Sequence, residues 1–169
     1  MREVEMPLLI FFISLFIIVG GVEGSHFLQY LGQFIINFVE QDLLLATIVL
    51  MWVAAFMSAA IDNIPFTAAM IPILLSLEAQ GMDITPLWWA LALGVGMGGN
   101  GTHIGSTANV YIVTVSERLA KKENNPELAI TPLKWAKIGL PVMILTLVIC
   151  TIIMYFFFDF YATPFPRTS

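Results

Sequence analysis

Two short polar segments interrupt the apolar stretches of this 169-residue chain, and they restrict its fold more than any other feature. The segments are residues 62–67 and 98–109, and apolar sequence flanks both of them. Backbone that is not helical leaves N–H and C=O groups unpaired, which costs several kcal/mol per group in hydrocarbon. At membrane depth such a break is stable only inside protein or beside a wet cavity. A pair of broken helices is typical of a transporter's binding site.

The composition predicts an all-α polytopic membrane protein in contact with lipid. Hydrophobic residues make up 59% of the chain and charged residues 11%, with a mean hydropathy of +0.88. A soluble domain carries roughly 25% charged residues. The sequence has no basic face for nucleic acid. It also has no metal-ligand cluster, nucleophile–base pair or phosphate loop, so we expect no enzyme activity and no cofactor, except Na⁺ or H⁺ as a coupling ion.

The lengths of the apolar runs predict the membrane elements. A helix needs about 20 apolar residues to cross a core of ~30 Å at about 1.5 Å per residue. Residues 7–24 and 139–160 meet this requirement and are predicted transmembrane helices. The runs 68–77 and 86–97 reach only about 15 Å and 18 Å, so neither crosses alone.

The two short runs are accounted for if each belongs to an interrupted element. We predict that residues 43–77 form a re-entrant helical hairpin with its tip at residues 62–67. Residues 86–117 then form one discontinuous transmembrane helix that breaks around residues 98–102. Both breaks would lie near the membrane midplane, side by side.

The placement of basic residues predicts the topology. Five of the seven Lys and Arg residues fall in the single connection that follows residue 115, namely Arg118, Lys121, Lys122, Lys134 and Lys137. The positive-inside rule puts the 116–138 connection in the cytoplasm and the C-terminus outside the cell membrane. If residues 43–77 crossed only once, residues 23–42 would be cytoplasmic although they contain no Lys or Arg. The hairpin therefore fits better than a single crossing.

The first polar segment contains the only acid that lies strictly within an apolar stretch, Asp62. A charge at bilayer depth costs at least about 2.5–3.5 kcal/mol, so it usually faces a cavity and marks an ion or proton path. We expect Asn63 to cap a helix that starts at Pro65, and we place Asp62, Asn63 and Thr67 in the candidate site. The alternative is a kinked helix with Asp62 as a plain N-cap.

The second polar segment supplies neutral oxygens, amides and glycines. Carbonyl, hydroxyl and amide oxygens bind hard cations, while free N–H groups at a helix start bind oxyanions. The segment is thus suited to Na⁺, an anion, or both. Its candidate site residues are Asn100, Gly101, Thr102, Gly105, Ser106, Thr107 and Asn109. The candidate Na⁺ ligands are Asn63, Thr67, Ser106 and Asn109.

Two other interpretations apply to parts of this segment. Small-residue helix packing would explain Gly101 and Gly105 but not the polar side chains around them. His103 is of a type that relays protons near neutral pH, although a simple hydrogen bond to a neighbouring carbonyl is the favoured role.

Three motifs give the chain a resemblance to a known family. They are DNIPFTAAMIPIL at 62–74, PLWWALALGVGMGGNGTHIGSTANV at 86–110 and WAKIGLPVMILTLVI at 135–149. The chain resembles the ArsB/NhaD-type permeases of the ion-transporter superfamily, a group of arsenite permeases, sodium–proton antiporters, the P protein and citrate transporter-like proteins. The resemblance implies two inverted repeats, each with a hairpin and a broken helix, of which this chain matches the second only. It also places the hairpin tip at 62–67, facing a break at 101–109. His103 departs from the aliphatic residue expected there.

Two classes of function follow from the sequence. The first is a secondary active ion transporter, of the anion-permease or Na⁺/H⁺-antiporter type, or the C-terminal portion of one. Because the first repeat is missing, it would act as a homo-oligomer or with a second chain that supplies that repeat. The second class is a truncated or partner-dependent membrane protein without transport of its own. An adjacent reading frame encoding the first repeat would favour the first class.

Overall fold

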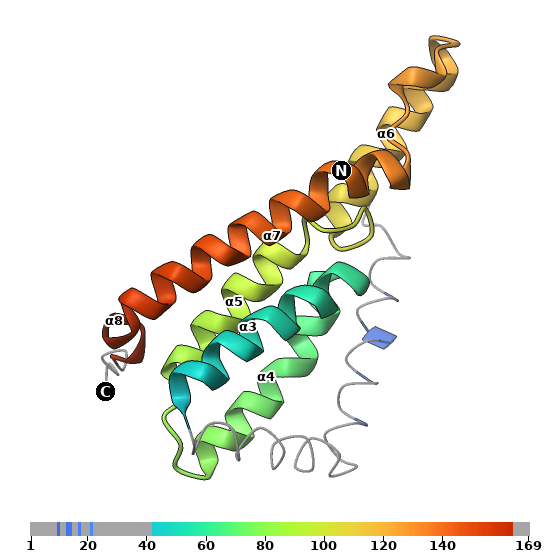
Figure 1. Cartoon of the computed structure of the whole chain (residues 1–169). Coiled ribbons are helices and arrows are strands. Elements are labelled where there is room, and N and C mark those ends of the chain that lie inside the picture. The colour runs from blue at the N-terminus through green and yellow to red at the C-terminus, as the bar shows by residue number, and fades with distance from the viewer. Residues whose placement is uncertain (1–9, 11–12, 15–16, 18–20, 22–41, 164–169) are drawn as a thin grey trace.

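The computed structural model describes residues 42–163 together with residues 10, 13, 14, 17 and 21. Those five residues are helical, and the rest of the helix expected at 7–24 lies outside the described part. Residues 42–163 form helices joined by short connections, without a strand, which confirms the all-α prediction for this part (Figure 1). In chain order the elements are α3 (Leu43–Ala60), α4 (Asn63–Ala79), α5 (Thr85–Gly98), α6 (Thr107–Lys122), the 3₁₀ turn η1 (Pro126–Leu128), α7 (Pro132–Phe156) and α8 (Phe158–Ala162).

Local capping residues set the starts of these helices. The Asp42 carboxylate accepts a hydrogen bond from Leu45 N at 3.0 Å and caps α3. The Thr131 hydroxyl accepts from Lys134 N at 3.2 Å and caps α7. Pro132 occupies the first turn, where its missing N–H has no helical partner to lose. Helix α7 therefore begins at residue 132 rather than at the expected 139. Its first two turns contain polar residues that precede the apolar run in the sequence.

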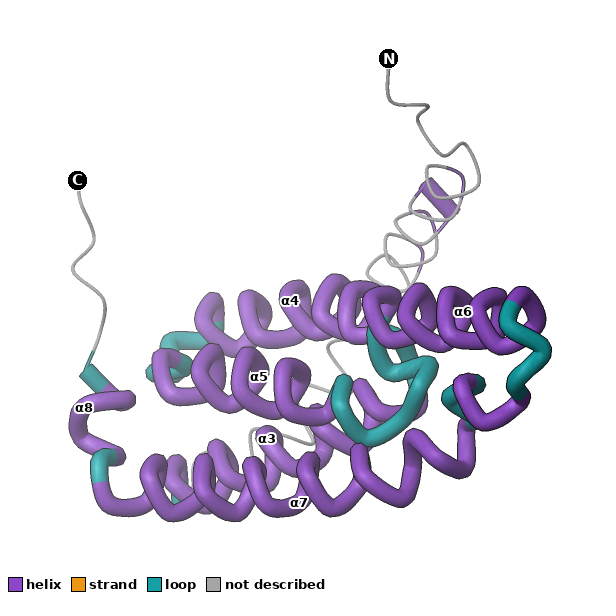
Figure 2. The backbone as a smooth tube through the Cα atoms, turned by 90° about the horizontal axis from the view of Figure 1, so that it is seen from above, coloured by secondary structure: helices purple, strands orange, loops and turns teal. Residues whose placement is uncertain are grey.

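Helix α5 is the centre of the bundle and packs against α3, α4, α7 and α8 (Figure 2). Its closest approach is to α3, and glycines make it possible. A Cβ added at Gly94 would lie 2.3 Å from Met51 O, and one at Gly98 would lie 2.3 Å from Ala55 O. Small residues four positions apart allow two membrane helices to meet backbone to backbone. The turn before α5 needs a glycine for another reason, since Gly81 has a φ of +86°.

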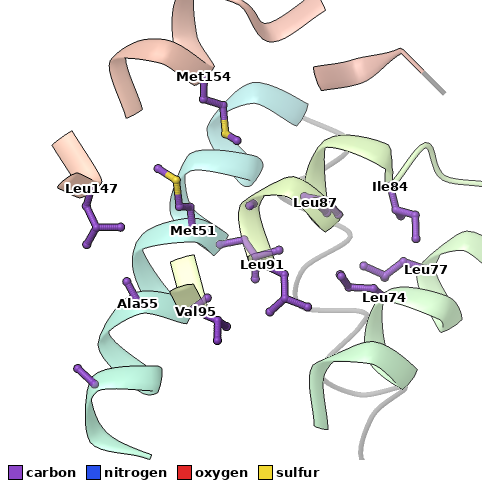
Figure 3. Packing of buried hydrophobic residues seen from close by; sticks show 14 of the residues in the cluster. Met51, Ala55, Leu74, Leu77, Ile84, Leu87, Leu91, Val95, Leu147 and Met154 are labelled. Carbon is purple, nitrogen blue, oxygen red and sulfur yellow. The ribbon is translucent and has the colours of Figure 1, made fainter. Parts of the chain in front are cut away.

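The apolar core is formed by buried side chains from four helices, α3, α4, α5 and α7 (Figure 3). Met51 from α3, Leu74 from α4, Leu87 from α5 and Leu147 from α7 are each fully buried. These contacts link residues that are far apart in the sequence into one apolar cluster. The cluster holds the ends of the interrupted elements in place.

The expected hairpin at 43–77 is present as two helices, but it is open. The chain breaks at Ile61 and Asp62, which confirms a break at the predicted tip. Helices α3 and α4 contact each other, but each packs more extensively on α5. Helix α4 is also longer than the apolar run 68–77, because residues 63–67 form its first turn.

Two helical spans in the described part are long and apolar enough to cross a membrane, namely α3 and the combined span of η1 and α7 (mean hydropathy 2.3 and 2.4). The 18 residues of α3 measure about 27 Å. Helix α3 runs antiparallel to α7, because Trp52 Nε1 donates to Thr151 Oγ1 at 2.9 Å while Ala59 and Met143 both lie against Gly101. Thus α3 extends along the apolar run of α7.

Candidate functional site

The two interruptions lie side by side, as predicted. Thr107 Oγ1, at the first residue of α6, donates to Asp62 Oδ2 at 2.7 Å. Thr102 Oγ1, in the break between α5 and α6, donates to Ala59 O in the last turn of α3. Two polar contacts therefore join the tip of the first element to the break of the second, across 43 and 45 residues of sequence.

Asp62 is the N-cap of α4, which corrects the expected cap at Asn63. Its Oδ1 accepts a hydrogen bond from Ile64 N at 3.0 Å, and the helix starts at Asn63 rather than at Pro65. The earlier start is tolerated because Pro65 is the third helical residue, where an N–H has no intrahelical acceptor. Asp62 thus fills the capping role that the sequence offered as an alternative, and it adds a contact to α6.

The charges at this point nearly balance. A helix N-terminus carries a partial charge of about +0.5, and the N-termini of α4 and α6 both meet the Asp62 carboxylate. One negative charge roughly offsets two such ends. Because Asp62 is half-buried, these interactions are screened less than those at an exposed site.

The break between α5 and α6 covers residues 99–106 and is longer than the predicted 98–102. Asn109, in the first turn of α6, holds it together from one side. Its Nδ2 donates to Gly99 O at 2.7 Å and to Thr102 O at 3.1 Å. Both acceptors are carbonyls, so the amide nitrogen must face them. The Asn109 side chain therefore pairs backbone groups that the break leaves without helical partners.

Gly101 and Gly105 are buried, and their surroundings explain why they are glycines. A Cβ at Gly101 would lie 2.5 Å from Met143 Sδ, and one at Gly105 would lie 3.1 Å from Ser58 O. The small-residue packing interpretation thus describes these two positions. Met143 lies near the start of the apolar run of α7. The break is therefore closer to one end of that run than the midplane position that we expect from the sequence.

The candidate Na⁺ ligands fall into two groups. Thr67 Oγ1 donates to Asn63 O at 2.8 Å within α4, while Ser106 is the N-cap residue of α6 without a side-chain capping bond. In the described part no hydrogen bond joins the α4 pair to Ser106 or Asn109, and the joint Na⁺ site stays a prediction. Across residues 42–163, no group of three His, Cys, Asp or Glu side chains is arranged to hold a metal ion.

Three further residues of the break differ in their surroundings. Thr107 is exposed apart from its bond to Asp62, and Asn100 is an exposed turn residue. His103 is half-buried, and its imidazole forms no hydrogen bond with the residues described, so the favoured bond to a neighbouring carbonyl is not found there.

Trp135 is a contact of the break that sequence reasoning missed. Its Nε1, in the first turn of α7, donates to Asn100 O at 3.0 Å. The only signal in the sequence was the third motif, in which Trp135 stands first. Nothing in the sequence neighbourhood of Trp135 points to a carbonyl 35 residues away.

Comparisons with known proteins show which family the chain resembles. The citrate transporter family profile matches residues 1–94. The human P protein is 41% identical over 126 residues, which cover 70% of this chain and 15% of that protein. The 46 kDa membrane protein of Mycobacterium leprae is 35% identical over 120 residues, covering 69% of this chain and 28% of its own length.

An uncharacterized transporter of Synechocystis sp. is 29% identical over 169 residues, covering 90% of this chain and 36% of its own. No solved structure matches the chain. The chain spans only 15% to 36% of the length of these three relatives. The family profile nevertheless covers more than half of the chain, and the chain is a membrane protein that belongs to the citrate transporter family.

Proposed function

We propose that the chain is the C-terminal repeat of a secondary active ion transporter, and that its half of the ion site lies at the meeting point of α4 and α6. The observation that carries this proposal is the 2.7 Å bond between Thr107 Oγ1 and Asp62 Oδ2. It brings two half-helix N-termini to one acid, the arrangement that discontinuous helices provide in transporters. Membership of the citrate transporter family supports the same function.

The charge balance favours a cation on this half of the site. Asp62 already occupies the positive ends of α4 and α6, so a further anion finds little unbalanced positive charge there. Na⁺ or H⁺ bound at Asp62 would neutralise the carboxylate. The positive ends of α4 and α6 could then attract a solute anion. Such a site serves a cation-coupled anion permease, and it serves a Na⁺/H⁺ antiporter if no anion binds.

For the topology, we place the 116–138 connection in the cytoplasm of a cell-membrane protein and the C-terminus outside. The five basic residues of this connection support that orientation. A re-entrant pair stays the preferred assignment for 43–77, because residues 23–42 contain no Lys or Arg. A single crossing by α3 is the alternative, since its length allows one.

Ligand-dependent unfolding in detergent tests the proposed site. A ligand that binds the folded chain raises its unfolding temperature in proportion to RT ln(1 + [L]/Kd), so we would titrate Na⁺, citrate, arsenite and sulfate separately and in pairs. We expect Na⁺ to stabilise the wild-type chain and Asp62→Asn to abolish this effect. Asp159→Asn changes an exposed acid outside the site and should keep it. A Na⁺ response equal in all three proteins would rule out the proposed cation site.

The second candidate function is a membrane protein that depends on a partner and does not transport alone. The observation that favours it is coverage, because the matching part of the human P protein is 15% of that protein. Reconstitution with and without a chain that supplies a first repeat separates the two. Uptake with the second chain would support the proposed transporter repeat, and no uptake in either condition would support this candidate.

A further inference from the structure

An apolar groove lies at the start of α7, apart from the Asp62 contact. Its volume is about 620 Å³, and its wall is formed by Ile130, Trp135, Ile138 and Val142. Asn100, in the break between α5 and α6, closes one side. The groove is open to the surroundings of the protein, and it begins where the polar first turns of α7 give way to the apolar run.

Two lysines, Lys134 and Lys137, also line this groove. Lys134 Nζ donates to Glu127 O and Ala129 O, both at 2.9 Å, which leaves one of its three N–H groups for another acceptor. Lys137 is exposed and forms no hydrogen bond or ion pair with the residues described. Two ammonium groups thus lie beside the apolar groove, and each has at least one N–H group available for another acceptor.

We propose that this groove binds an anionic phospholipid, with an acyl chain along Ile138 and Val142 and the phosphate at Lys134 and Lys137. Basic pockets beside transmembrane helices bind acidic headgroups, and Lys side chains near helix ends reach the headgroup layer. Trp135 lies between the two lysines in sequence and has the amphipathic ring favoured at this depth. The charge and the apolar lining together favour a lipid, because a free phosphate ion would contact only the lysines and leave the apolar part of the groove unoccupied.

The groove also adjoins the break between α5 and α6. Trp135 Nε1 donates to Asn100 O, and a Cβ at Gly139 would lie 2.3 Å from the same oxygen. The wall of the groove is therefore fixed to the segment that joins α5 to α6. A bound lipid would hold α7 and Asn100 together, and the site stands whether or not the chain proves to be a transporter.

The test is thermal unfolding of the full 169-residue chain in a neutral detergent. Phosphatidylglycerol, phosphatidylcholine with the same acyl chains, and inorganic phosphate are titrated in parallel. We expect only phosphatidylglycerol to raise the unfolding temperature with dose. Lys134→Gln/Lys137→Gln should raise the apparent Kd roughly 30-fold, as expected for two lysines near a headgroup layer. Val142→Trp, which fills the groove and keeps both lysines, should also lose the shift.

Lys121→Gln/Lys122→Gln is the matched control, because it removes two charges from α6 that do not line the groove, and it should keep the full shift. An equal loss in this control would reduce the effect to diffuse charge and overturn the proposal. So would equal shifts with phosphatidylcholine, or a shift with phosphate alone. An unfolding temperature that ignores phosphatidylglycerol but rises with protein concentration would assign the groove to a second copy of the chain. Circular dichroism of each variant establishes that it is folded.

Discussion

Asp62 makes one contact with each interrupted element: its Oδ1 caps α4, and its Oδ2 accepts from Thr107. The sequence predicted the importance of this residue, because an acid within an apolar stretch is costly unless it is partnered. It did not predict the partner. Thr107 is one of several hydroxyl residues in the second polar segment, and only the packing of α3 on α5 decides which of them faces Asp62.

Removing the Thr107 hydroxyl tests this contact. Thr107→Val keeps the shape of the side chain but leaves Asp62 Oδ2 without its donor, and we expect a loss of about 1–3 kcal/mol in the free energy of unfolding. Thr114→Val is the control, since the Thr114 hydroxyl donates only to Val110 O one turn back. Denaturant unfolding in detergent, followed by circular dichroism, measures both. Equal effects of the two substitutions would contradict a special role for Thr107.

Asn109 gives a second test within the same site. Asn109→Asp replaces the donor amide by a carboxylate, which repels Gly99 O and Thr102 O instead of bonding to them. We expect the amides of residues 99–106 to exchange hydrogen faster, while those in the middle of α5 stay protected. Hydrogen exchange read by mass spectrometry makes the comparison. Unchanged exchange in the break would show that Asn109 does not hold it.

The sequence predicted where the helices are interrupted, but it did not predict which helices pack against each other. Pro65, the acid Asp62 and the glycine-rich run from Gly98 marked where helices end or begin. The pairing of α3 with α5 had no such signal, because both helices are apolar on all sides and show no preferred face. The close approach depends on Gly94 and Gly98, whose spacing is visible in the sequence but does not name the opposite helix.

Substitutions in α5 can measure how much this close approach contributes. Gly94→Ala and Gly98→Ala place a methyl group 2.3 Å from backbone oxygens of α3, and we expect each to destabilise the chain by about 1–3 kcal/mol. Gly96→Ala is the control in the same helix, because a Cβ there meets nothing within 4 Å. Alanine should leave stability unchanged or raise it by about 0.5–1 kcal/mol at that position. Thermal unfolding of the three variants ranks them, and a similar loss at Gly96 would refute the packing argument.

The described helices also leave apolar surface uncovered. Tyr111, Ile112 and Leu119 on α6 are exposed, and among the described elements α6 makes its main contact with η1 rather than with another long helix. Thr107 is exposed on the same helix, so part of this surface is polar and unsuited to lipid. We therefore expect further protein to cover α6 in the working assembly.

Transport by the isolated chain tests that expectation. Reconstituted as a monomer at high lipid-to-protein ratio, the chain should show no ion-gradient-coupled uptake, because the proposed C-terminal repeat would supply only half of the polar lining. Proteoliposomes loaded with a Na⁺ or proton gradient give the measurement, with Asp62→Ala as the inactive reference. Uptake that scales with monomer and disappears in Asp62→Ala would show that one repeat is sufficient.

The bond between Asp62 and Thr107 has a consequence for how the chain is made. The acid leaves the ribosome 45 residues before the hydroxyl that neutralises part of its cost. Until then the Asp62 carboxylate has only the Ile64 N–H of its own helix as a partner, against a cost of about 2.5–3.5 kcal/mol for a charge at bilayer depth. Stable insertion of α4 therefore waits for α5 and α6. A ribosome stalled before residue 107 would hold a nascent chain whose first polar segment still remains beside the insertion machinery.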